Sequence, residues 1–415
     1  MTGWAGELIG RTAEPVARTA GRMAHFGAGP CDDLVMHFGA HKTGSSSIQA
    51  TLRAHAGPGS GYVYPDLGQA NGSLTLAFAF ASAQSLRTWD FVHSPTLAAA
   101  QRLRMQARLG WAMRAARPGL PTILSGEVIA HFRPPDLAVL DQFARGAARQ
   151  SRYLGYVREP VSALTSAFQE MIKEVLPTRH FLLPDMPEGF FLRDTHEVIG
   201  ALDRIAGQTR VEVHAFDRSQ FPGGDVVRHF LDRTGIRPDG LPLATVNPGL
   251  GLLAVRLLYI YRSRLAPRDG AIGSPWSLDP FIAALATLGG PRFVLHPDLA
   301  GRIAKANHPA YDWSARRLPQ PFAPPALSAG PEAQTVRGAA DLLRLDGQDG
   351  DAVADWAALH GVKADRGLSA DLDAVAALIH AVRLEFARRH PPEGWRRLFG
   401  RDRCSAPREA TGLPP

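Results

Sequence analysis

At 415 residues, the chain is long enough for one large domain with additions or for two domains. Its 45% hydrophobic and 8% aromatic residues are typical of a globular protein, and no run of eighteen apolar residues could span a bilayer. The N-terminus carries scattered charges and lacks the apolar stretch of a signal peptide. The sequence therefore predicts a cytoplasmic protein without a transmembrane segment, and it leaves peripheral membrane contact open.

Cysteine content and charge exclude several classes of protein. Cys31 and Cys404 are the only cysteines, and neither has the spacing of a disulfide framework or a structural metal site. The net charge is +7, but only four of the 46 basic residues are lysines, as in proteins from GC-rich genomes. Such basicity would attract an anionic cofactor without identifying it. We expect no metal and no nucleic-acid partner.

Short apolar segments alternate with helical patterns over the first 265 residues. The candidate strands, in chain order, are 34–38, 62–64, 122–125, 153–157 and 211–216. Each is almost continuously apolar, which is typical of strands that are buried on both faces of a parallel sheet. The predicted fold class is therefore α/β, a three-layer sandwich with a central parallel sheet of about five strands and a helical C-terminal extension.

We expect four regions along the chain. They are an N-terminal extension (1–33), a core (34–265), a helical continuation of that core (266–320), and a Pro/Ala-rich linker with a helical C-terminal region (321–415). The clearest late helix, 370–389, places apolar residues on one face.

The loop after the first candidate strand carries the strongest chemical signal. The strand ends at Gly39, the loop turns through Gly44, and a helix begins at Ser45, so several backbone N–H groups can point at one anion. Lys42 adds a positive charge. Hydroxyl donors come from Thr43, Ser45, Ser46 and Ser47. The pattern predicts a phosphate or sulfate site, and it is not a Walker A loop because the lysine precedes the second glycine.

A second basic residue follows the strand 153–157. Arg158 ends this strand, Pro160 suits the first turn of the next helix, and Ser166 lies two turns further on. Arg158 and Ser166 can therefore converge on one phosphate, whose oxygens suit the planar fork of an arginine.

A carboxylate follows the strand 122–125. Glu127 is expected at the carboxyl edge of the sheet, where ligands bind in open parallel sheets, and it could accept a proton from a hydroxyl group. Alternatively, Glu127 caps the helix that follows. His131, one helical turn later, is a second candidate base or a partner that orients the first.

Together these motifs resemble one family. Lys42-Thr43-Gly44-Ser45-Ser46 is similar to the 5'-phosphosulfate loop of sulfotransferases that use 3'-phosphoadenylyl sulfate (PAPS), most closely the bacterial members. An arginine followed eight residues later by a serine resembles their 3'-phosphate site, and Ser125-Gly126-Glu127 resembles their Ser-small-Glu segment. The resemblance spans 34–265 and implies a P-loop-type fold, although the Arg-Lys-Gly loop of the cytosolic animal enzymes has no counterpart.

The resemblance also implies roles for individual residues. Lys42 would contact the phosphosulfate and neutralise charge on its bridging oxygen, while Arg158 and Ser166 would bind the 3'-phosphate. Glu127 would be the base, and His41 would either pack within the loop or lie beside the sulfuryl group. Gly44, Ser45 and Ser46 would hold the 5'-phosphate, and Thr43 would also belong to the cofactor site.

The implied activity is transfer of a sulfuryl group from PAPS to a hydroxyl or amine of a carbohydrate, a lipid or a small molecule, without a metal. Two alternatives stay open. One is a P-loop nucleotide kinase or hydrolase, and the other is a non-catalytic anion-binding protein with the same fold. The sequence does not identify the acceptor or the oligomeric state.

Overall fold

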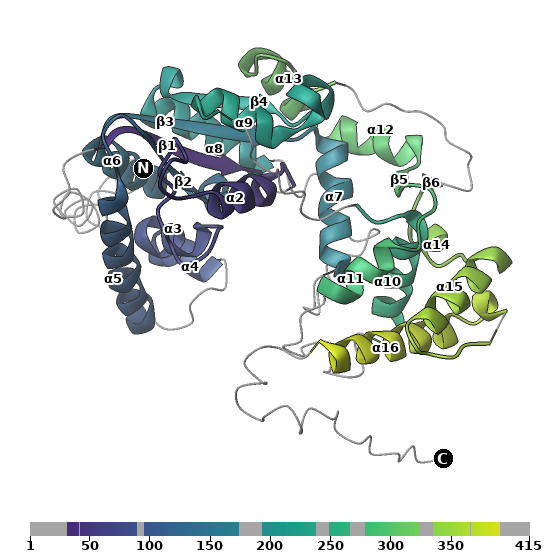
Figure 1. The fold of residues 1–415 in the computed structure, drawn as a ribbon. Helices are drawn as coiled ribbons and strands as arrows, with labels where there is room; N and C mark the ends of the chain where they lie inside the picture. The colour runs from purple at the N-terminus through teal and green to yellow at the C-terminus, as the bar shows by residue number, and fades with distance from the viewer. Residues whose placement is uncertain are drawn as a thin grey trace, which may run out of the picture. The chain divides into compact units, whose positions relative to one another are not determined.

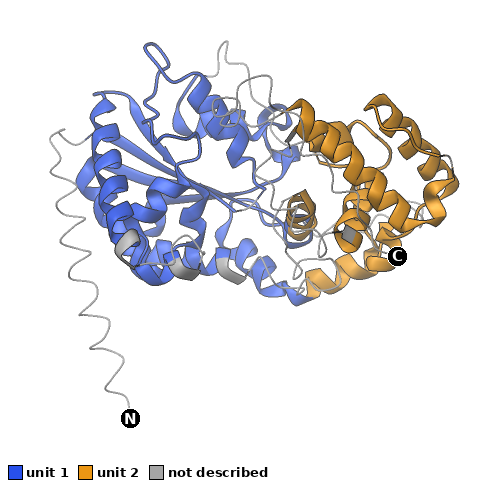
Figure 2. Cartoon of the chain, turned by 90° about the horizontal axis from the view of Figure 1, so that it is seen from below, with its two compact units in different colours: residues 1–163, 189–246, 306–325 blue, residues 164–188, 247–305, 326–415 orange. Residues whose placement is uncertain are grey.

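The computed structural model describes residues 31–40, 42–88, 95–173, 193–237, 249–265, 279–323, 335–365 and 367–390. The chain divides into two compact units (Figure 2). The first comprises 1–163, 189–246 and 306–325, and the second comprises 164–188, 247–305 and 326–415.

The first unit contains a parallel sheet, which confirms the predicted fold class (Figure 1). Its strands are β1 (Cys31–Gly39), β2 (Pro121–Ser125), β3 (Ala148–Val157) and β4 (Val211–Ala215). Among the described residues, these four strands have the order β2-β1-β3-β4. Crossover connections of this kind bring the carboxyl ends of all four strands to one edge of the sheet.

The remaining candidate strand, 62–64, contributes a single bridge to the sheet. Val63 donates its N–H to the carbonyl of Pro121 and accepts the N–H of Ile123, each at 2.9 Å. The next main-chain donor in such a parallel ladder would belong to Pro65, which has no N–H. The pairing therefore ends after one residue.

Helices cover both faces of the sheet because side chains alternate along each strand. Leu34, Met36 and Phe38 of β1 pack with α3 (Ser73–Phe80), α5 (Pro95–Ala112), α6 (Pro134–Ala147) and α8 (Arg193–Ala206). Val35 lies on the opposite face, in a second cluster with α2 (Ser45–Ala54) and α9 (Val226–Thr234). The unit is thus a three-layer sandwich. It also contains α4 (Ala83–Thr88) and α13 (His308–Arg317).

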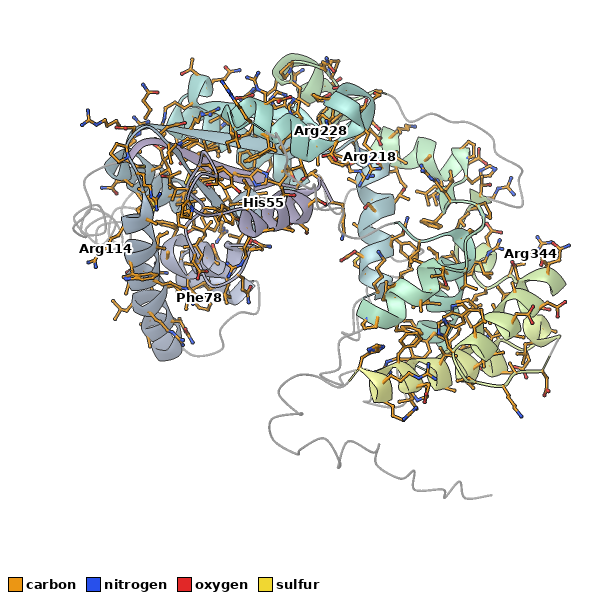
Figure 3. All side chains as sticks on the ribbon, viewed as in Figure 1. His55, Phe78, Arg114, Arg218, Arg228 and Arg344 are labelled. Atoms are coloured by element: carbon orange, nitrogen blue, oxygen red, sulfur yellow. The ribbon has the colours of Figure 1, made fainter. Side chains whose placement is uncertain are left out.

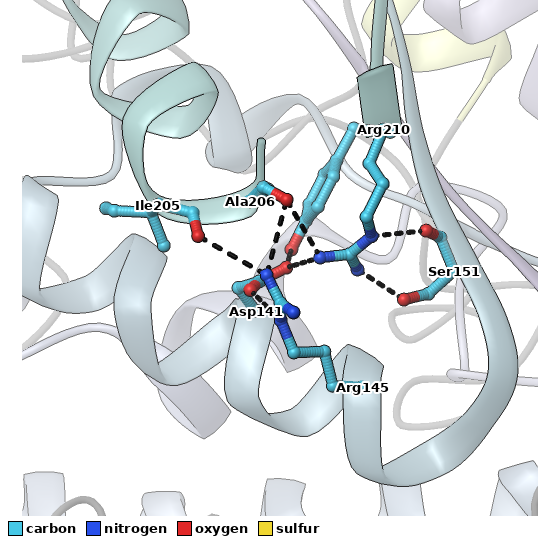
Figure 4. Close-up of polar contacts among 7 residues, drawn as sticks. Asp141, Arg145, Ser151, Ile205, Ala206 and Arg210 are labelled. Atoms are coloured by element: carbon cyan, nitrogen blue, oxygen red, sulfur yellow. Dashed lines mark hydrogen bonds and ion pairs between the residues drawn. The ribbon is translucent and has the colours of Figure 1, made fainter. Parts of the chain in front are cut away.

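A polar clamp fastens the amino end of β3 to the helices beside it (Figure 4). The buried carboxylate of Asp141 in α6 accepts hydrogen bonds from Arg145 at 2.7 Å, Arg210 at 2.9 Å and the hydroxyl of Tyr153 at 3.2 Å. Arg210 also donates to the carbonyl of Ser151 at 2.8 Å. These bonds satisfy a charge that would be costly to bury alone.

The second unit is mainly helical. Its helices are most of α7 (Pro160–Lys173), then α10 (Leu252–Leu265), α11 (Asp279–Ala286), α12 (Pro297–Ala306), α14 (Ala339–Leu342), α15 (Gly347–Leu359) and α16 (Leu372–Arg389). Two short parallel strands, β5 (Val294–Leu295) and β6 (Thr335–Val336), complete it. Arg383 of α16 donates to the Tyr261 hydroxyl of α10 at 2.7 Å. In the described parts of the chain, no helix is both long and apolar enough to cross a membrane.

Candidate functional site

The loop between β1 and α2 has an unusual backbone conformation. Lys42 has a φ of 64° and is the one non-glycine residue with positive φ in the described ranges. Gly44, at the N-cap of α2, has a φ of 80° and provides no capping side chain. The amides of Ser45 and Ser46 lie in the first turn of α2, where a helix offers no main-chain acceptor. A non-glycine residue held in this region signals a constrained loop, and such loops are frequent at ligand sites.

Close packing explains the two glycines. A Cβ on Gly39 would lie 2.3 Å from the Ser45 hydroxyl, and one on Gly44 would lie 2.5 Å from Cγ1 of Val226. Thr43 is fully buried, and its hydroxyl donates to the carbonyl of Ala40 at 2.8 Å. The loop therefore folds tightly over the end of β1 and against the start of α9. In this conformation the Thr43 hydroxyl stabilises the loop itself, and the helix N-terminus is the part suited to an anion.

Arg158 lies against the same loop, although it is more than a hundred residues distant in sequence. Its guanidinium donates to the carbonyl of Lys42 at 2.9 Å and to the hydroxyl of Ser162 at 2.8 Å. It also lies over the ring of Phe216, 5.3 Å from the centroid. The structure thus brings together Lys42 and Arg158, the two basic residues that the sequence singled out.

The helix that follows Arg158 is anchored at its first turn. The carboxylate of Glu159 accepts the N–H groups of Val161 and Ser162 at 2.9 and 2.7 Å, and it also accepts the hydroxyl of Tyr311 from α13. These contacts hold Arg158 at the end of β3. Tyr311 could not be identified from the sequence, since nothing in the sequence indicates that α13 reaches this position.

Further positive charge lies in the segment between β4 and α9. Burial lowers the pKa of Arg158, the carboxylate of Glu159 opposes that shift, and the nearby positive charge of Arg218 lowers it further. Arg218 lies in this segment and Arg228 lies in α9, and both are exposed (Figure 3). Arg218 was not among the residues predicted from the sequence, because only the fold reveals that it follows the strand next to the one that precedes Arg158. Arg218 therefore adds positive charge near Arg158, which contacts the loop.

The candidate base lies at the same edge of the sheet. Glu127 begins a 3₁₀ helix (Glu127–His131) directly after β2, and β2 is hydrogen-bonded to β1 along its length. Glu127 is half-buried. Burial lowers the pKa of His131, which favours a neutral imidazole. The predicted placement of both residues beyond the carboxyl end of a strand is therefore observed.

Beneath this edge, the hydroxyl of Ser125 joins three elements. Its Oγ lies 2.7 Å from Nδ1 of His37 in β1, and it accepts a hydrogen bond from Nε2 of Gln49 in α2 at 2.9 Å. Burial lowers the pKa of His37 to about 3, so this imidazole is neutral near pH 7. Its Nε2 has no hydrogen-bond partner in the described structure. A buried polar atom left in this state costs about 1–3 kcal/mol.

None of the contacts described above joins the candidate residues His41 and Ser166 to Lys42, Arg158 or Glu127. His41 lies outside the described residues. Ser166 is half-buried in the part of α7 that belongs to the second unit. Ser162, one helical turn earlier, is the serine that bonds Arg158. Ser162 lies on the polar side of the same helix, and this position could have identified it from the sequence as a partner of Arg158. No group of three or more His, Cys, Asp or Glu side chains in the described ranges could hold a metal ion.

No protein-family model matches the sequence, and no curated protein matches it. Among solved structures, the crystal structure of a sulfotransferase from Alicyclobacillus acidocaldarius is similar to this chain, with 16% sequence identity and a TM-score of 0.31. The similarity covers 53% of this chain and 87% of that one. At this level of similarity, the site has to be interpreted from its own residues.

Proposed function

We propose that this chain transfers a sulfuryl group from PAPS to an acceptor hydroxyl or amine. The observation that carries the proposal is the hydrogen bond between the Arg158 guanidinium and the Lys42 carbonyl. It joins two motifs that each resemble one part of a PAPS site. The fold, the constrained loop and the cationic surroundings support the same interpretation.

The residues present fit such a donor. A Cβ at Gly39 or Gly44 would collide with Ser45 or Val226, so the two glycines permit the tight loop that leads into the N-terminus of α2, where an anion would bind. In the proposal, Gly44, Ser45 and Ser46 hold the 5'-phosphate, and Lys42 contacts the phosphosulfate. Arg158, together with Ser162 or Ser166, holds the 3'-phosphate.

In the proposed reaction, the bond between sulfur and the bridging phosphate oxygen breaks as a bond from sulfur to the acceptor oxygen or nitrogen forms. Glu127 takes the acceptor proton, with His131 as the alternative base. Lys42 stabilises the charge that develops on the bridging oxygen, and this electrostatic contribution is expected to be large in a constrained loop. A carbohydrate, a lipid or a small molecule would serve as acceptor.

Calorimetric titration tests the donor assignment. Adenosine 3',5'-bisphosphate should bind and raise the melting temperature, whereas ATP with Mg²⁺ should do neither. Lys42→Ala should weaken the binding about tenfold or more, since hydrogen bonds to charged groups contribute about 1.5–3 kcal/mol. Lys305→Ala serves as the matched control because it removes a different lysine, which is exposed and belongs to none of the motifs.

The other outcomes identify the alternatives. Binding of ATP with Mg²⁺ in preference to the bisphosphate would favour a nucleotide kinase or hydrolase. Binding of the bisphosphate without transfer of labelled sulfate to carbohydrate, lipid or metabolite extracts, combined with no effect of Glu127→Gln, would favour a non-catalytic anion-binding protein.

A further inference from the structure

The hydroxyl of Ser125 is a buried junction beside the proposed site. It contacts Nδ1 of His37 at 2.7 Å and the side-chain amide of Gln49 at 2.9 Å. The exposed fractions of Ser125, His37 and Gln49 are 1%, 1% and 2%, so water does not compete for these bonds. In addition, Gly126 donates its N–H to the carbonyl of His37 at 3.0 Å. The junction thus links the helix that begins at the anion loop to the segment that carries Glu127.

A histidine at position 37 lowers the stability of the fold, because it buries a polar ring. In either tautomer, one ring nitrogen faces Ser125, and the other, Nε2, has no hydrogen-bond partner within the described structure. The ring packs edge-on against Phe230, with centroids 4.9 Å apart, and it also contacts Tyr156. An apolar side chain would fill this space without leaving a buried polar atom unpaired. Among the described residues, the contact from Nδ1 to the Ser125 hydroxyl is the one hydrogen bond of the ring that offsets this cost.

We propose that His37 is a positioning residue, which fixes the Ser125 hydroxyl between β1 and α2 and so holds Gly126 and Glu127 at a set distance from the anion loop. The inference rests on the proposed function, because the distance matters only if Glu127 takes a proton from an acceptor held near Lys42. His37 itself touches neither donor nor acceptor.

Four variants of the full chain test the proposal. His37→Leu removes the polar atoms, and Ser125→Ala removes the hydroxyl at the junction. His37→Asn keeps an amide group near the place of Nδ1, and it can donate or accept there. Thr122→Val is the matched control, because it removes a fully buried hydroxyl from the same strand, three residues before Ser125.

Hydrogen exchange followed by mass spectrometry provides the first readout. We expect His37→Leu to keep or raise the melting temperature. We also expect it to speed exchange within 125–131 about tenfold, because a segment can open locally without global unfolding. Ser125→Ala should speed exchange in the same segment, His37→Asn should restore slow exchange, and Thr122→Val should leave it unchanged. Unchanged exchange in His37→Leu would overturn the proposal. Faster exchange throughout the first unit, in proportion to the loss of stability, would also overturn the proposal, because it would mark His37 as an ordinary core residue.

The second readout is turnover, measured as release of adenosine 3',5'-bisphosphate from PAPS with a phenol as acceptor. His37→Leu should lower kcat about tenfold while KM for the donor stays within about twofold, since small displacements of a catalytic group are costly. Equal turnover in wild type and His37→Leu would refute the positioning role. A wild-type chain that neither binds the bisphosphate nor releases it would refute the proposed function, and the exchange experiment would still decide the role of His37.

Discussion

The guanidinium of Arg158 donates a 2.9 Å hydrogen bond to the main-chain carbonyl of Lys42, which has a positive φ. This bond connects the end of β3 to the loop that follows β1. Adjacent parallel strands explain the meeting, because β1 and β3 are hydrogen-bonded neighbours whose carboxyl ends lie together. The unusual backbone of Lys42 is therefore held by a side chain from another part of the chain, as well as by its own loop.

Arg158 should not be replaceable by lysine. A lysine at position 158 keeps the charge, but it cannot contact the Lys42 carbonyl, the Ser162 hydroxyl and an anion with one planar group. We expect Arg158→Lys to weaken binding of adenosine 3',5'-bisphosphate about tenfold in calorimetric titration, equivalent to about 1.4 kcal/mol. Arg114→Lys, at an exposed arginine in the first unit (Figure 3), should leave the affinity unchanged. Equal affinities of all three proteins would show that the planar fork is not required.

Gly44→Ala should destabilise the first unit. An alanine there must adopt a φ of 80° and lies 2.5 Å from Cγ1 of Val226, so strain and overpacking add. The expected loss is about 2–4 kcal/mol in chemical denaturation, of which about 1–2 kcal/mol is backbone strain. Gly59→Ala isolates the strain, because Gly59 has a φ of 86° and open space around its Cβ position.

The same site permits a test of the steric contribution. In the double variant Gly44→Ala/Val226→Ala, the clash is relieved, so the combined loss should be smaller than the sum of the two single losses. Additive losses in the double-mutant cycle would show that Val226 does not limit the space at Gly44.

The buried carboxylate of Asp141 should contribute more to stability than its exposed partner Arg145 (Figure 4). The side chain of Asp141 is 5% exposed, that of Arg210 is 22% exposed and that of Arg145 is 56% exposed. We expect Asp141→Ala to cost about 3 kcal/mol, since it leaves Arg210 without its carboxylate. Arg145→Ala should cost less than about 1 kcal/mol, as is usual for exposed ion pairs. Similar losses for the two variants, measured by urea denaturation, would contradict this ranking.

The buried His37 should make the free energy of unfolding depend on pH. Burial lowers the pKa of this histidine from its ordinary value near 6.5 to about 3 in the folded protein. Between these two values the unfolded chain binds a proton that the folded chain excludes, so stability falls as the pH decreases from about 6.5 toward 3. In His37→Leu this contribution is absent. The variant should therefore gain stability relative to wild type by up to about 1.4 kcal/mol per pH unit below 6.5.

Urea denaturation of both proteins at several pH values measures this difference. The other histidines are common to wild type and variant, so the comparison isolates position 37. A stability difference that does not change between pH 7 and pH 5 would mean that His37 is protonated as readily in the folded protein as in the unfolded chain.

The local sequence was sufficient to predict the parallel sheet, because buried strands and amphipathic helices carry distinct periodicities. The helix predicted to begin at Ser45 is observed as Ser45–Ala54, and the late helix predicted for 370–389 is observed as Leu372–Arg389. The strand predicted for 62–64 shortens to one bridge, in agreement with the position of Pro65. Each of these features depends on residues within one short segment, and for that reason it can be predicted from the sequence.

Contacts between distant segments were decided by the tertiary structure. The sequence indicated that Lys42, Glu127 and Arg158 each follow a strand, and it suggested Ser166 as the companion of Arg158. Only the fold shows that Ser162 bonds the guanidinium and that Phe216 lies beneath it.

The same distinction applies to His37. From its sequence position, His37 is a mid-strand residue on a buried face. The fold adds the Ser125 hydroxyl from β2, which contacts His37 and also accepts a hydrogen bond from the Gln49 amide of α2. The sequence by itself determined which groups could bind an anion or move a proton, because that capacity belongs to each side chain. The tertiary structure decided which of these groups meet, because their meeting depends on the order of strands in the sheet and on the helices packed against it.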